Sequence, residues 1–346
     1  MGEGIVHTSD RYARQILFPG IGLDGQTKLA AARVVLVGSG ADGSAMADRL
    51  VRAGVGHLVI IDRDYVELNN LQRQMLYDEE DVSARLPKAV AAERKLRLIN
   101  SQVTVQGVVA DINSENVEEL VQGADLVMDG TDNFEVRYLV NDVCVKQGIP
   151  WVYCGVVASY GMTMTVVPHR TPCLRCVFAE APPPGSVVTC DTAGIVNPIV
   201  FVLAGIAVAE GIKLLAGTGD INRGIIYVDL WQNVFDVLEH GLPRADCPAC
   251  GQGRYDWLQA ARDTQAVSLC GRNAVQVRPR RAEQLAMESL TGRLRAVGQI
   301  VASNEYLVCL RVDDYEITVF GDGRAIVKGT DDPTVARSLY SKYVGL

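Results

Sequence analysis

The sequence lacks three features that would direct a protein to nucleic acid, to a membrane or out of the cell. Basic residues are not in excess, since 33 Lys and Arg face 41 Asp and Glu, for a formal net charge of −8. Nucleic-acid binding needs clustered Lys and Arg. The most apolar stretch, residues 199–209, is shorter than the ~20 residues that span a bilayer. The first 20 residues have no apolar core and do not read as a signal peptide. We therefore expect a cytoplasmic protein that binds neither nucleic acid nor membrane.

Internal repeats are also missing, and low complexity is confined to the prolines at 182–184. A chain of 346 residues suggests two domains at ~100–200 residues each. The pattern of apolar residues fades after residue 250 and then resumes as short β-like runs. We predict a first domain at 1–255, a linker at 256–265 and a small α+β domain at 266–346.

A disulfide framework is not expected, because the nine cysteines are odd in number and no secretion signal accompanies them. Four of them form two Cys-x-x-Cys pairs, Cys173 with Cys176 and Cys247 with Cys250, separated by 70 residues. Four thiolates at this spacing suit tetrahedral zinc. The alternative is a set of buried or redox-active thiols. A zinc ion with four thiolate ligands has no open position, so a structural role is expected.

Strands and helices alternate through the first domain. Short apolar runs that end in glycine or an acid predict buried strands, and longer segments between them predict helices. This alternation indicates a doubly wound, Rossmann-like parallel sheet. The expected strands lie at 33–38, 58–62, 103–109, 126–129 and 151–154, with helices at 44–53, 88–99, 114–122 and 133–147. Further strands at 162–167 and 224–229, possibly antiparallel, flank a long apolar helix at 198–216.

A glycine motif follows the first of these strands. Gly38, Gly40 and Gly43 form G-x-G-x-x-G between a strand and a helix. Glycines allow a tight turn and a close approach of the backbone, and the helix N-terminus offers free N–H groups to phosphate. Asp62 ends the next strand, where an acid can bind ribose hydroxyls. The motif alone fits an NAD enzyme as well as an ATP enzyme.

The residues after Asp62 favour a triphosphate. Asn70, Arg73 and Gln74 lie in one polar segment, Lys88 opens the next helix, and Asp132 follows the fourth strand. Arg and Lys can neutralise phosphate oxygens, and a carboxylate can hold Mg²⁺. The alternatives are solvated surface charge for Arg73 and Lys88, and a turn or helix cap for Asp132.

Over residues 8–250 the chain resembles the ThiF/MoeB/HesA superfamily, the bacterial relatives of ubiquitin-activating enzymes. The resemblance rests on R-Y-x-R-Q at 11–15, the glycine loop, D-x-D-x-V-x-x-x-N-L-x-R-Q at 62–74, Lys88, T-D-N at 131–133, both Cys-x-x-Cys pairs and Thr189-Cys190. It implies ATP, Mg²⁺ and Zn²⁺ as ligands of the protein.

The resemblance also assigns roles to individual residues. Asp62 would bind the ribose, and Asp132 would bind magnesium. Arg14 would reach the triphosphate from the partner subunit of a homodimer. Three residues would bind phosphates and a fourth would shape their pocket: Asn70, Arg73 and Lys88, and Gln74.

Two positions need separate comment. Asp42 stands in the glycine loop where the superfamily usually has Leu or Ile, and a carboxylate there should repel a triphosphate, although it suits a helix N-terminus. Cys190 follows a proline-rich segment and precedes a predicted helix, where a thiol can have a lowered pKa. It resembles the cysteine that thiamine-pathway members use to link to their carrier. The alternative is a packed or dispensable thiol.

The implied activity is ATP-dependent adenylation of the C-terminal carboxylate of a ubiquitin-like sulfur carrier that ends in Gly-Gly. A separate sulfur donor, of the cysteine desulfurase or rhodanese type, would then supply sulfur. Residues 269–276 resemble the tail of some thiamine-pathway members, which favours that pathway. The alternatives are a molybdopterin-pathway adenylyltransferase and a weakly catalytic scaffold that binds the carrier. An NAD-dependent oxidoreductase would leave the cysteine pairs and Asp132 unexplained.

Overall fold

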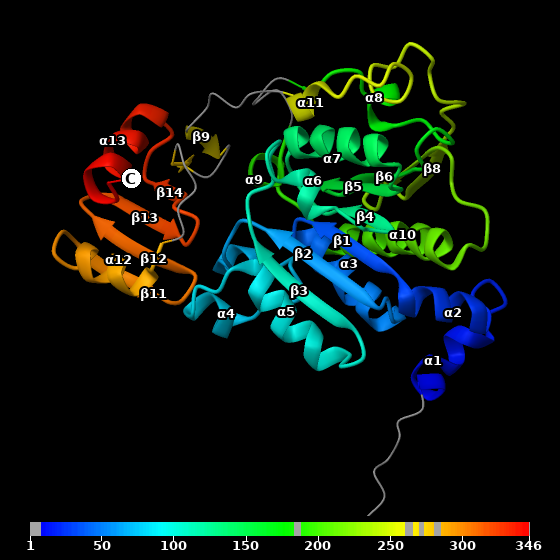
Figure 1. Ribbon diagram of the computed structural model, residues 1–346, viewed down its shortest axis with the longest axis horizontal. Helices are drawn as coiled ribbons and strands as arrows, with labels where there is room; N and C mark the ends of the chain where they lie inside the picture. Colours follow the sequence, from blue (N-terminus) through cyan, green and yellow to red (C-terminus); the bar gives the residue numbers. More distant parts are fainter. Residues whose placement is uncertain (1–7, 183–187, 260–265, 270–272, 280–284, 346) are drawn as a thin grey trace, which may run out of the picture. The chain divides into compact units, whose positions relative to one another are not determined.

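The computed structural model describes residues 8–182, 188–259, 266–269, 273–279 and 285–345 (Figure 1). The described residues form two compact units. The larger unit holds the described residues up to 79, together with 87–182 and 194–259. The smaller unit holds 80–86, 188–193 and the described residues from 266 onward. The smaller unit therefore takes two short segments from inside the predicted first domain, which a division at one linker does not anticipate.

The larger unit is built on a sheet of eight strands in the order β3-β2-β1-β4-β5-β6-β7-β8. The pairs among the first five strands are parallel, and the pairs from β5 to β8 are antiparallel. This is the mixed α/β sheet expected from the sequence, with the later strands antiparallel. The strands are β1 (Arg33–Val37), β2 (His57–Asp62), β3 (Thr104–Val109), β4 (Leu126–Asp129), β5 (Trp151–Val157), β6 (Tyr160–Val166), β7 (Ile225–Asp229) and β8 (Val234–Leu238).

Helices cover both faces of this sheet (Figure 1). On one face lie α3 (Ala41–Ala53), α5 (Lys88–Ile99) and α10 (Asn197–Ala216), and on the other α6 (Val117–Leu120) and α7 (Phe134–Gln147). Successive side chains of β1 point to opposite faces of the sheet, and the strand is buried on both because helices cover both faces. Val35 and Val37 belong to the core on the α7 side. The other helices of this unit are α1 (Thr8–Leu17), α2 (Gly22–Ala31), the 3-10 helix η1 (Leu68–Asn70), α8 (Leu174–Val177) and α11 (Asp256–Gln259).

Helix α10 is the most apolar helix of the chain. It has 20 residues, and among the described residues it is the one helix long and apolar enough to cross a membrane. The stretch 199–209 noted in the sequence is thus part of a longer apolar helix. The helix packs against α3, β5 and β6, and half of its most apolar window is buried inside the protein. This packing accounts for the apolar residues of the buried half of the helix.

The smaller unit is an antiparallel sheet of six strands in the order β11-β12-β13-β14-β10-β9. Its core joins one face of the sheet to α12 and α13. The elements are α4 (Glu79–Ser83, most of which lies in this unit), α9 (Cys190–Ala193), β9 (Ala266–Leu269), β10 (Ala274–Val277), α12 (Met287–Leu294), β11 (Gln299–Ser303), β12 (Leu307–Val312), β13 (Tyr315–Phe320), β14 (Ala325–Lys328) and α13 (Pro333–Tyr343). The sequence did not predict β8, β9 or α12.

The segment 80–86 is held within the smaller unit by polar contacts. Arg85 forms an ion pair with Glu316, with 2.8 Å between Nη1 and Oε1, and its Nη1 lies 3.1 Å from the sulfur of Cys309. The side chain of Asn304 donates to the carbonyl of Ala84 at 3.1 Å. Arg85 has a φ of 45°, a left-handed conformation that is uncommon outside glycine, and these contacts fix it there.

Candidate nucleotide site and metal centre

The glycine loop lies where the strand order reverses, between β1 and β4. This is the place where doubly wound sheets bind their ligands. A Cβ on Gly38 would lie 2.7 Å from the carbonyl oxygen of Gly130, and Gly38 has a φ of 86°. A Cβ on Gly43 would overlap the carbonyl of Gly38. These glycines are needed because the loop and the end of β4 meet backbone to backbone.

Gly40 differs from the other two glycines of the motif. The nearest heavy atom to a Cβ built on Gly40 is 3.8 Å away, so the protein itself leaves room for a side chain there. Gly40 is also the N-cap of α3, and no side chain caps that helix. The free N–H groups of the helix start therefore stay available to a ligand, which is the arrangement that binds phosphate.

Asp62 ends β2 beside this loop, and both of its carboxylate oxygens are oriented by backbone N–H groups. Oδ2 accepts from Ser39 at 2.6 Å and Oδ1 from Asp64 at 2.7 Å. Burial raises the pKa of Asp62, and the nearby charge of Lys88 opposes this rise. Each oxygen keeps lone pairs for a further donor, so the group can accept from ribose hydroxyls.

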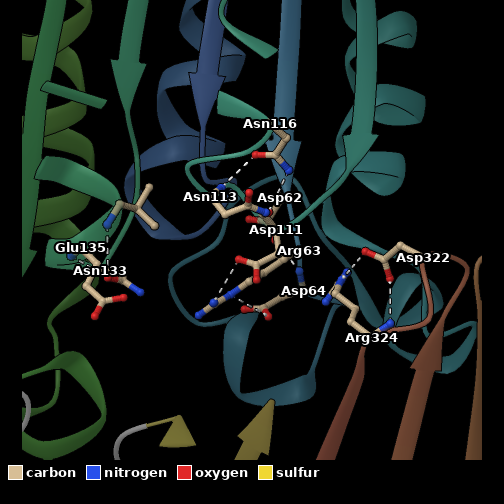
Figure 2. A network of polar contacts seen from close by, with 11 residues as sticks. Asp62, Arg63, Asp64, Asp111, Asn113, Asn116, Asn133, Glu135, Asp322 and Arg324 are labelled. Atoms are coloured by element: carbon tan, nitrogen blue, oxygen red, sulfur yellow. Dashed lines mark hydrogen bonds and ion pairs between the residues drawn. The ribbon is translucent and has the colours of Figure 1, made fainter. Parts of the chain in front are cut away.

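The residues around Asp62 form a polar network (Figure 2). The guanidinium of Arg63 bonds the Asp111 carboxylate at 3.3 Å and lies 3.9 Å from that of Asp64. Asn113 and Asn116 close the adjacent turn, where the Asn113 N–H donates to the Asn116 side chain at 2.9 Å. These contacts fix the strand ends that carry Asp62 and its neighbours.

Asn70, Arg73 and Gln74 lie on the segment that follows. Asn70 is buried, and its side chain accepts from the N–H of Glu67 in a capping box around η1. Arg73 is half-buried and donates to the carbonyl of Asn69 at 2.8 Å. Gln74 is 3% exposed, and its Oε1 has no hydrogen-bond partner within the described part of the chain. A buried acceptor of this kind is expected to be satisfied by a ligand or water.

Lys88 is the first residue of α5 and is 4% exposed. Its Nζ lies 3.5 Å from Oδ2 of Asp64, and its N–H donates to the Asp64 carbonyl at 2.9 Å. The reading of Lys88 as solvated surface charge is therefore wrong.

The end of β4 carries a second buried ion pair. Nε of Arg137 lies 3.1 Å from Oδ2 of Asp129, and Thr131 bonds the other oxygen of the same carboxylate. Asp132 is exposed, and the N-cap of α7 is Asn133, whose side chain accepts from the N–H of Glu135 at 2.8 Å (Figure 2). The helix cap is therefore Asn133 and not Asp132.

The sequence alone does not single out Arg137. It lies inside a predicted helix and looks like one more surface charge, yet it is buried and also bonds the carbonyl of Cys154 at 3.2 Å. Its position among the apolar residues of α7 was the available signal, because an arginine on a buried helix face needs a buried acid.

Asp42 of the glycine loop is almost fully buried at 6% exposure, and Oδ1 makes no hydrogen bond within the described residues. Burial raises its pKa to about 7, with Arg137 opposing the rise and the acids Asp129 and Asp132 adding to it. The carboxyl group is thus partly neutral near neutral pH, which reduces the repulsion expected against a triphosphate.

The four paired cysteines come together. Their sulfur atoms all lie within 4.8 Å of one another, and the closest separations are 3.3 Å for Cys176–Cys250, 3.6 Å for Cys173–Cys247 and 3.9 Å for Cys173–Cys176. Four sulfurs at a Zn–S distance of about 2.3 Å stand roughly 3.8 Å apart in a tetrahedron. The cluster therefore fits a structural zinc ion.

Charged residues next to the cluster tie it to α7. Arg175, between the first two cysteines, lies 3.6 Å from the Asp142 carboxylate and 2.9 Å from that of Asp256. Asp142 also accepts from the N–H of Trp257 at 3.1 Å. Arg175 offsets negative charge from the thiolates as well as from these acids.

The two remaining predicted site residues, Arg14 and Cys190, lie on short helices outside the glycine loop and its neighbouring strands. Arg14 is exposed in the last turn of α1. Cys190 is half-buried at the start of α9, a helix of four residues in the smaller unit.

A glycine loop at the switch point of the sheet and a buried acid after β2 define an α/β protein of the nucleotide-binding class, and its cluster of four cysteines fits a metal ion. The family model described as the ThiF family matches residues 12–249. The chain is 48% identical, over 97% of its length and 99% of the relative's, to the sulfur carrier protein ThiS adenylyltransferase of Bacillus subtilis. The chain belongs to the ThiF family.

Two more distant relatives agree. A sulfur carrier protein adenylyltransferase of Thermus thermophilus is 39% identical, covering 70% of this chain and 90% of the relative. Among solved structures, E. coli MccB with ATP superposes with a TM-score of 0.62 at 25% identity, over 70% of this chain and 75% of MccB. The structural match supports the placement of the sheet and its glycine loop.

Proposed function

We propose that this chain uses ATP to adenylate the C-terminal carboxylate of a small ubiquitin-like sulfur-carrier protein, with release of pyrophosphate. The observation that carries the proposal is the 48% identity along 97% of the chain to an adenylyltransferase of the sulfur carrier ThiS. The buried arrangement of Asp62 and Lys88 around the glycine loop is consistent with it.

The pathway we propose is sulfur transfer for the thiazole of thiamine. The match to the ThiS adenylyltransferase runs through the smaller unit, whereas the match to the Thermus relative covers 70% of the chain. A molybdopterin-pathway carrier is the alternative, since the chemistry is the same. A scaffold that binds the carrier with little catalysis is the second alternative, suggested by Asp42.

The substrate ATP would lie over the glycine loop. The backbone N–H groups after Gly40 would bind phosphate oxygens, and Asp62 would accept from the ribose. Arg73 and Lys88 would neutralise the triphosphate. Asn70 would contribute its side chain to the phosphates, and Gln74 would line the pocket with its buried Oε1.

In the reaction, an oxygen of the carrier carboxylate forms a bond to the α-phosphorus of ATP. The bond between that phosphorus and the oxygen bridging to the β-phosphate breaks, and pyrophosphate leaves. The nucleophile is already an anion, so no protein base has to remove a proton. The protein supplies position and charge neutralisation. Bound at Asp132, Mg²⁺ would neutralise phosphate oxygens.

We also propose a homodimer in which Arg14 serves the nucleotide site of the neighbouring subunit. Its exposed place at the end of α1 allows this role. The test mixes two inactive variants, Arg14→Ala and Asp132→Ala, since one hybrid site would hold both intact groups. If the subunits exchange and no activity returns, Arg14 acts within its own chain or not at all.

A separate sulfur donor, a cysteine desulfurase or a rhodanese-type protein, would convert the adenylate to a thiocarboxylate. Cys190 would link covalently to the carrier during this transfer. We propose the cytoplasm as the compartment of the reaction.

The test of the central proposal is carrier-dependent exchange of labelled pyrophosphate into ATP. The purified chain is assayed with Mg²⁺, ATP and a ThiS-type carrier ending in Gly-Gly, and the control is the same carrier without its last glycine. Exchange with the intact carrier and none with the truncated one is expected. If neither a ThiS-type nor a molybdopterin-type carrier supports exchange, the proposal is wrong and the alternative of a carrier-binding scaffold with little catalysis is favoured.

A further inference from the structure

Tyr77 lies on the segment between Gln74 and α4, and neither the motif nor the proposed reaction assigns it a role. Its ring is 7% exposed. Its hydroxyl lies 2.7 Å from Oγ of Ser39 and donates to the Ser39 carbonyl at 2.8 Å. The carbonyl of Lys88 is 3.3 Å from the same hydroxyl. One oxygen atom therefore contacts both the glycine loop and the first residue of α5.

The hydrogen atoms of this arrangement balance. A tyrosine hydroxyl carries one hydrogen and can also accept. The Ser39 hydroxyl donates to Tyr77, and Tyr77 donates to the Ser39 carbonyl at 2.8 Å, with the Lys88 carbonyl as a second, longer acceptor.

Ser39 extends the connection to a third element, because its N–H donates to Oδ2 of Asp62 at 2.6 Å. The glycine loop, the ribose-binding acid and the start of α5 are thus joined through Ser39 and Tyr77. These elements come from β1, β2 and α5, which lie apart in the sequence.

We propose that Tyr77 is a positioning residue for the phosphate-binding side of the nucleotide site. Its hydroxyl sets the distance between the glycine loop and Lys88, and it does not touch the substrate itself. This inference rests on the proposed function, since Lys88 and the loop are taken to bind the triphosphate. The affinity for a triphosphate depends on groups that already lie at the right distances before it binds. A small displacement of a charged group such as Lys88 would therefore weaken triphosphate binding strongly.

The test is Tyr77→Phe, which keeps the ring in the core and removes only the hydroxyl. Binding of MgATP and of adenosine is measured by calorimetry without any carrier. We expect MgATP to bind about tenfold more weakly, the effect of losing about one buried hydrogen bond, and adenosine within about a factor of two. In exchange assays the KM for ATP should rise while the KM for the carrier stays unchanged.

The matched control is Tyr340→Phe in the smaller unit. Tyr340 is also buried, and its hydroxyl donates to the carbonyl of Gly323 at 2.7 Å. This variant loses an equivalent hydrogen bond away from the loop, and its MgATP affinity should not change. Equal weakening of MgATP and adenosine by Tyr77→Phe would show a general structural role and overturn the proposal. Unchanged MgATP binding would overturn it as well.

Ser39→Ala supplies a second route should Tyr77→Phe fold poorly, since it removes the contact between the Ser39 hydroxyl and the Tyr77 hydroxyl, although the bond from Tyr77 to the Ser39 carbonyl stays. A smaller loss of MgATP affinity than in Tyr77→Phe is expected. The double variant should then weaken MgATP binding little more than Tyr77→Phe alone, because the contact that Ser39→Ala removes is already lost in Tyr77→Phe. Fully additive effects would separate the two residues and refute the shared role. A wild-type protein that binds MgATP but shows no carrier-dependent exchange would count against the proposed function, while leaving the binding test of Tyr77 intact.

Discussion

The ammonium group of Lys88 lies 3.5 Å from the carboxylate of Asp64, although Lys88 occupies the first position of α5. The N-terminus of a helix carries partial positive charge, which disfavours a cation there. The acids Asp62 and Asp64 offset this cost in the protein without nucleotide. A triphosphate would add the negative charge that this end of the helix favours.

Lys88→Met should therefore reduce carrier-dependent pyrophosphate exchange by about a hundredfold or more, the loss of roughly 3 kcal/mol of stabilisation of developing phosphate charge. The variant should also unfold more readily, because two acids lose their buried cation. Lys146→Met is the control, since Lys146 pairs with Glu118 on the exposed side of α7. Exchange within a factor of about five of the unmutated protein would contradict the phosphate role.

Asp132→Ala should abolish exchange and leave the fold intact, because the side chain is exposed and Asn133 caps the helix. The cause is loss of the proposed magnesium ligand. The control is Glu135→Ala, which removes a carboxylate from the same helix start. Exchange by Asp132→Ala within about threefold, less than ~1 kcal/mol of transition-state loss, would rule out the ligand assignment.

The purified protein should carry one tightly bound zinc per chain. Cys247→Ser should lose the metal and lower the free energy of unfolding by roughly 3–5 kcal/mol, since a closed site contributes folding energy. Cys144→Ser is the control, because Cys144 is buried but belongs to no cysteine cluster among the described residues. Metal analysis of protein prepared without chelator that finds no zinc would refute the assignment.

The pKa of Asp42, raised by burial to about 7 from 3.8, makes stability depend on pH. The folded protein keeps this proton while the unfolded chain loses it, so stability falls as pH rises from about 4 to about 7, and the penalty is complete above 7. Asp42→Asn should then stabilise the protein at pH 8, by on the order of 4 kcal/mol at most, and little at pH 4.

The same variant bears on ATP. In the unmutated protein the KM for ATP should rise above pH 7 as Asp42 ionises, and Asp42→Asn should flatten that rise. Asp48→Asn serves as the control on the same helix, where Asp48 pairs with Arg52. Parallel pH profiles for the Asp42 variant and the unmutated protein would show that this carboxyl group does not act on the nucleotide.

Cys190→Ser separates two chemical steps. Exchange of pyrophosphate should stay near normal, because adenylation needs no thiol. In the complete reaction with a sulfur donor, the variant should form no thioester between carrier and enzyme that an added thiol cleaves, and less thiocarboxylate. The reason is that the Cys190 thiolate would attack the carbonyl carbon of the acyl-adenylate, forming the C–S bond as AMP leaves. Mass spectrometry of the carrier measures both. Full thiocarboxylate from the variant would remove Cys190 from the mechanism and favour the molybdopterin-type alternative.

The sequence predicts an element or a site correctly where a residue pattern has one usual structural role. The parallel strands from β1 to β5 follow from apolar runs ended by glycine or an acid, and the four cysteines follow from their spacing. The roles of Tyr77 and Arg137 could not be predicted, because their partners are backbone carbonyls and acids on distant elements. Strand β8 was missed because its exposed apolar side chains do not alternate with polar ones.

Asp42 illustrates a different limit. Its place in the motif was visible, and so was the conflict with a bound triphosphate, but its pKa depends on its burial and on charged side chains from β4 and α7. A sequence identifies a titratable group and its ordinary pKa. It does not give the burial and the neighbouring charges that shift this pKa in the folded protein. The outcome for the nucleotide therefore remained open until the packing was known.

The ion pair between Arg85 and Glu316 joins residues 231 positions apart in the chain. During synthesis Arg85 leaves the ribosome long before its partner strand exists, so this part of the smaller unit must wait for the end of translation. A fragment that begins at residue 266 would also leave its arginine behind. The C-terminal region is thus not a module that can be transplanted or deleted with one cut, and its loss would release a segment that ends two residues before Lys88.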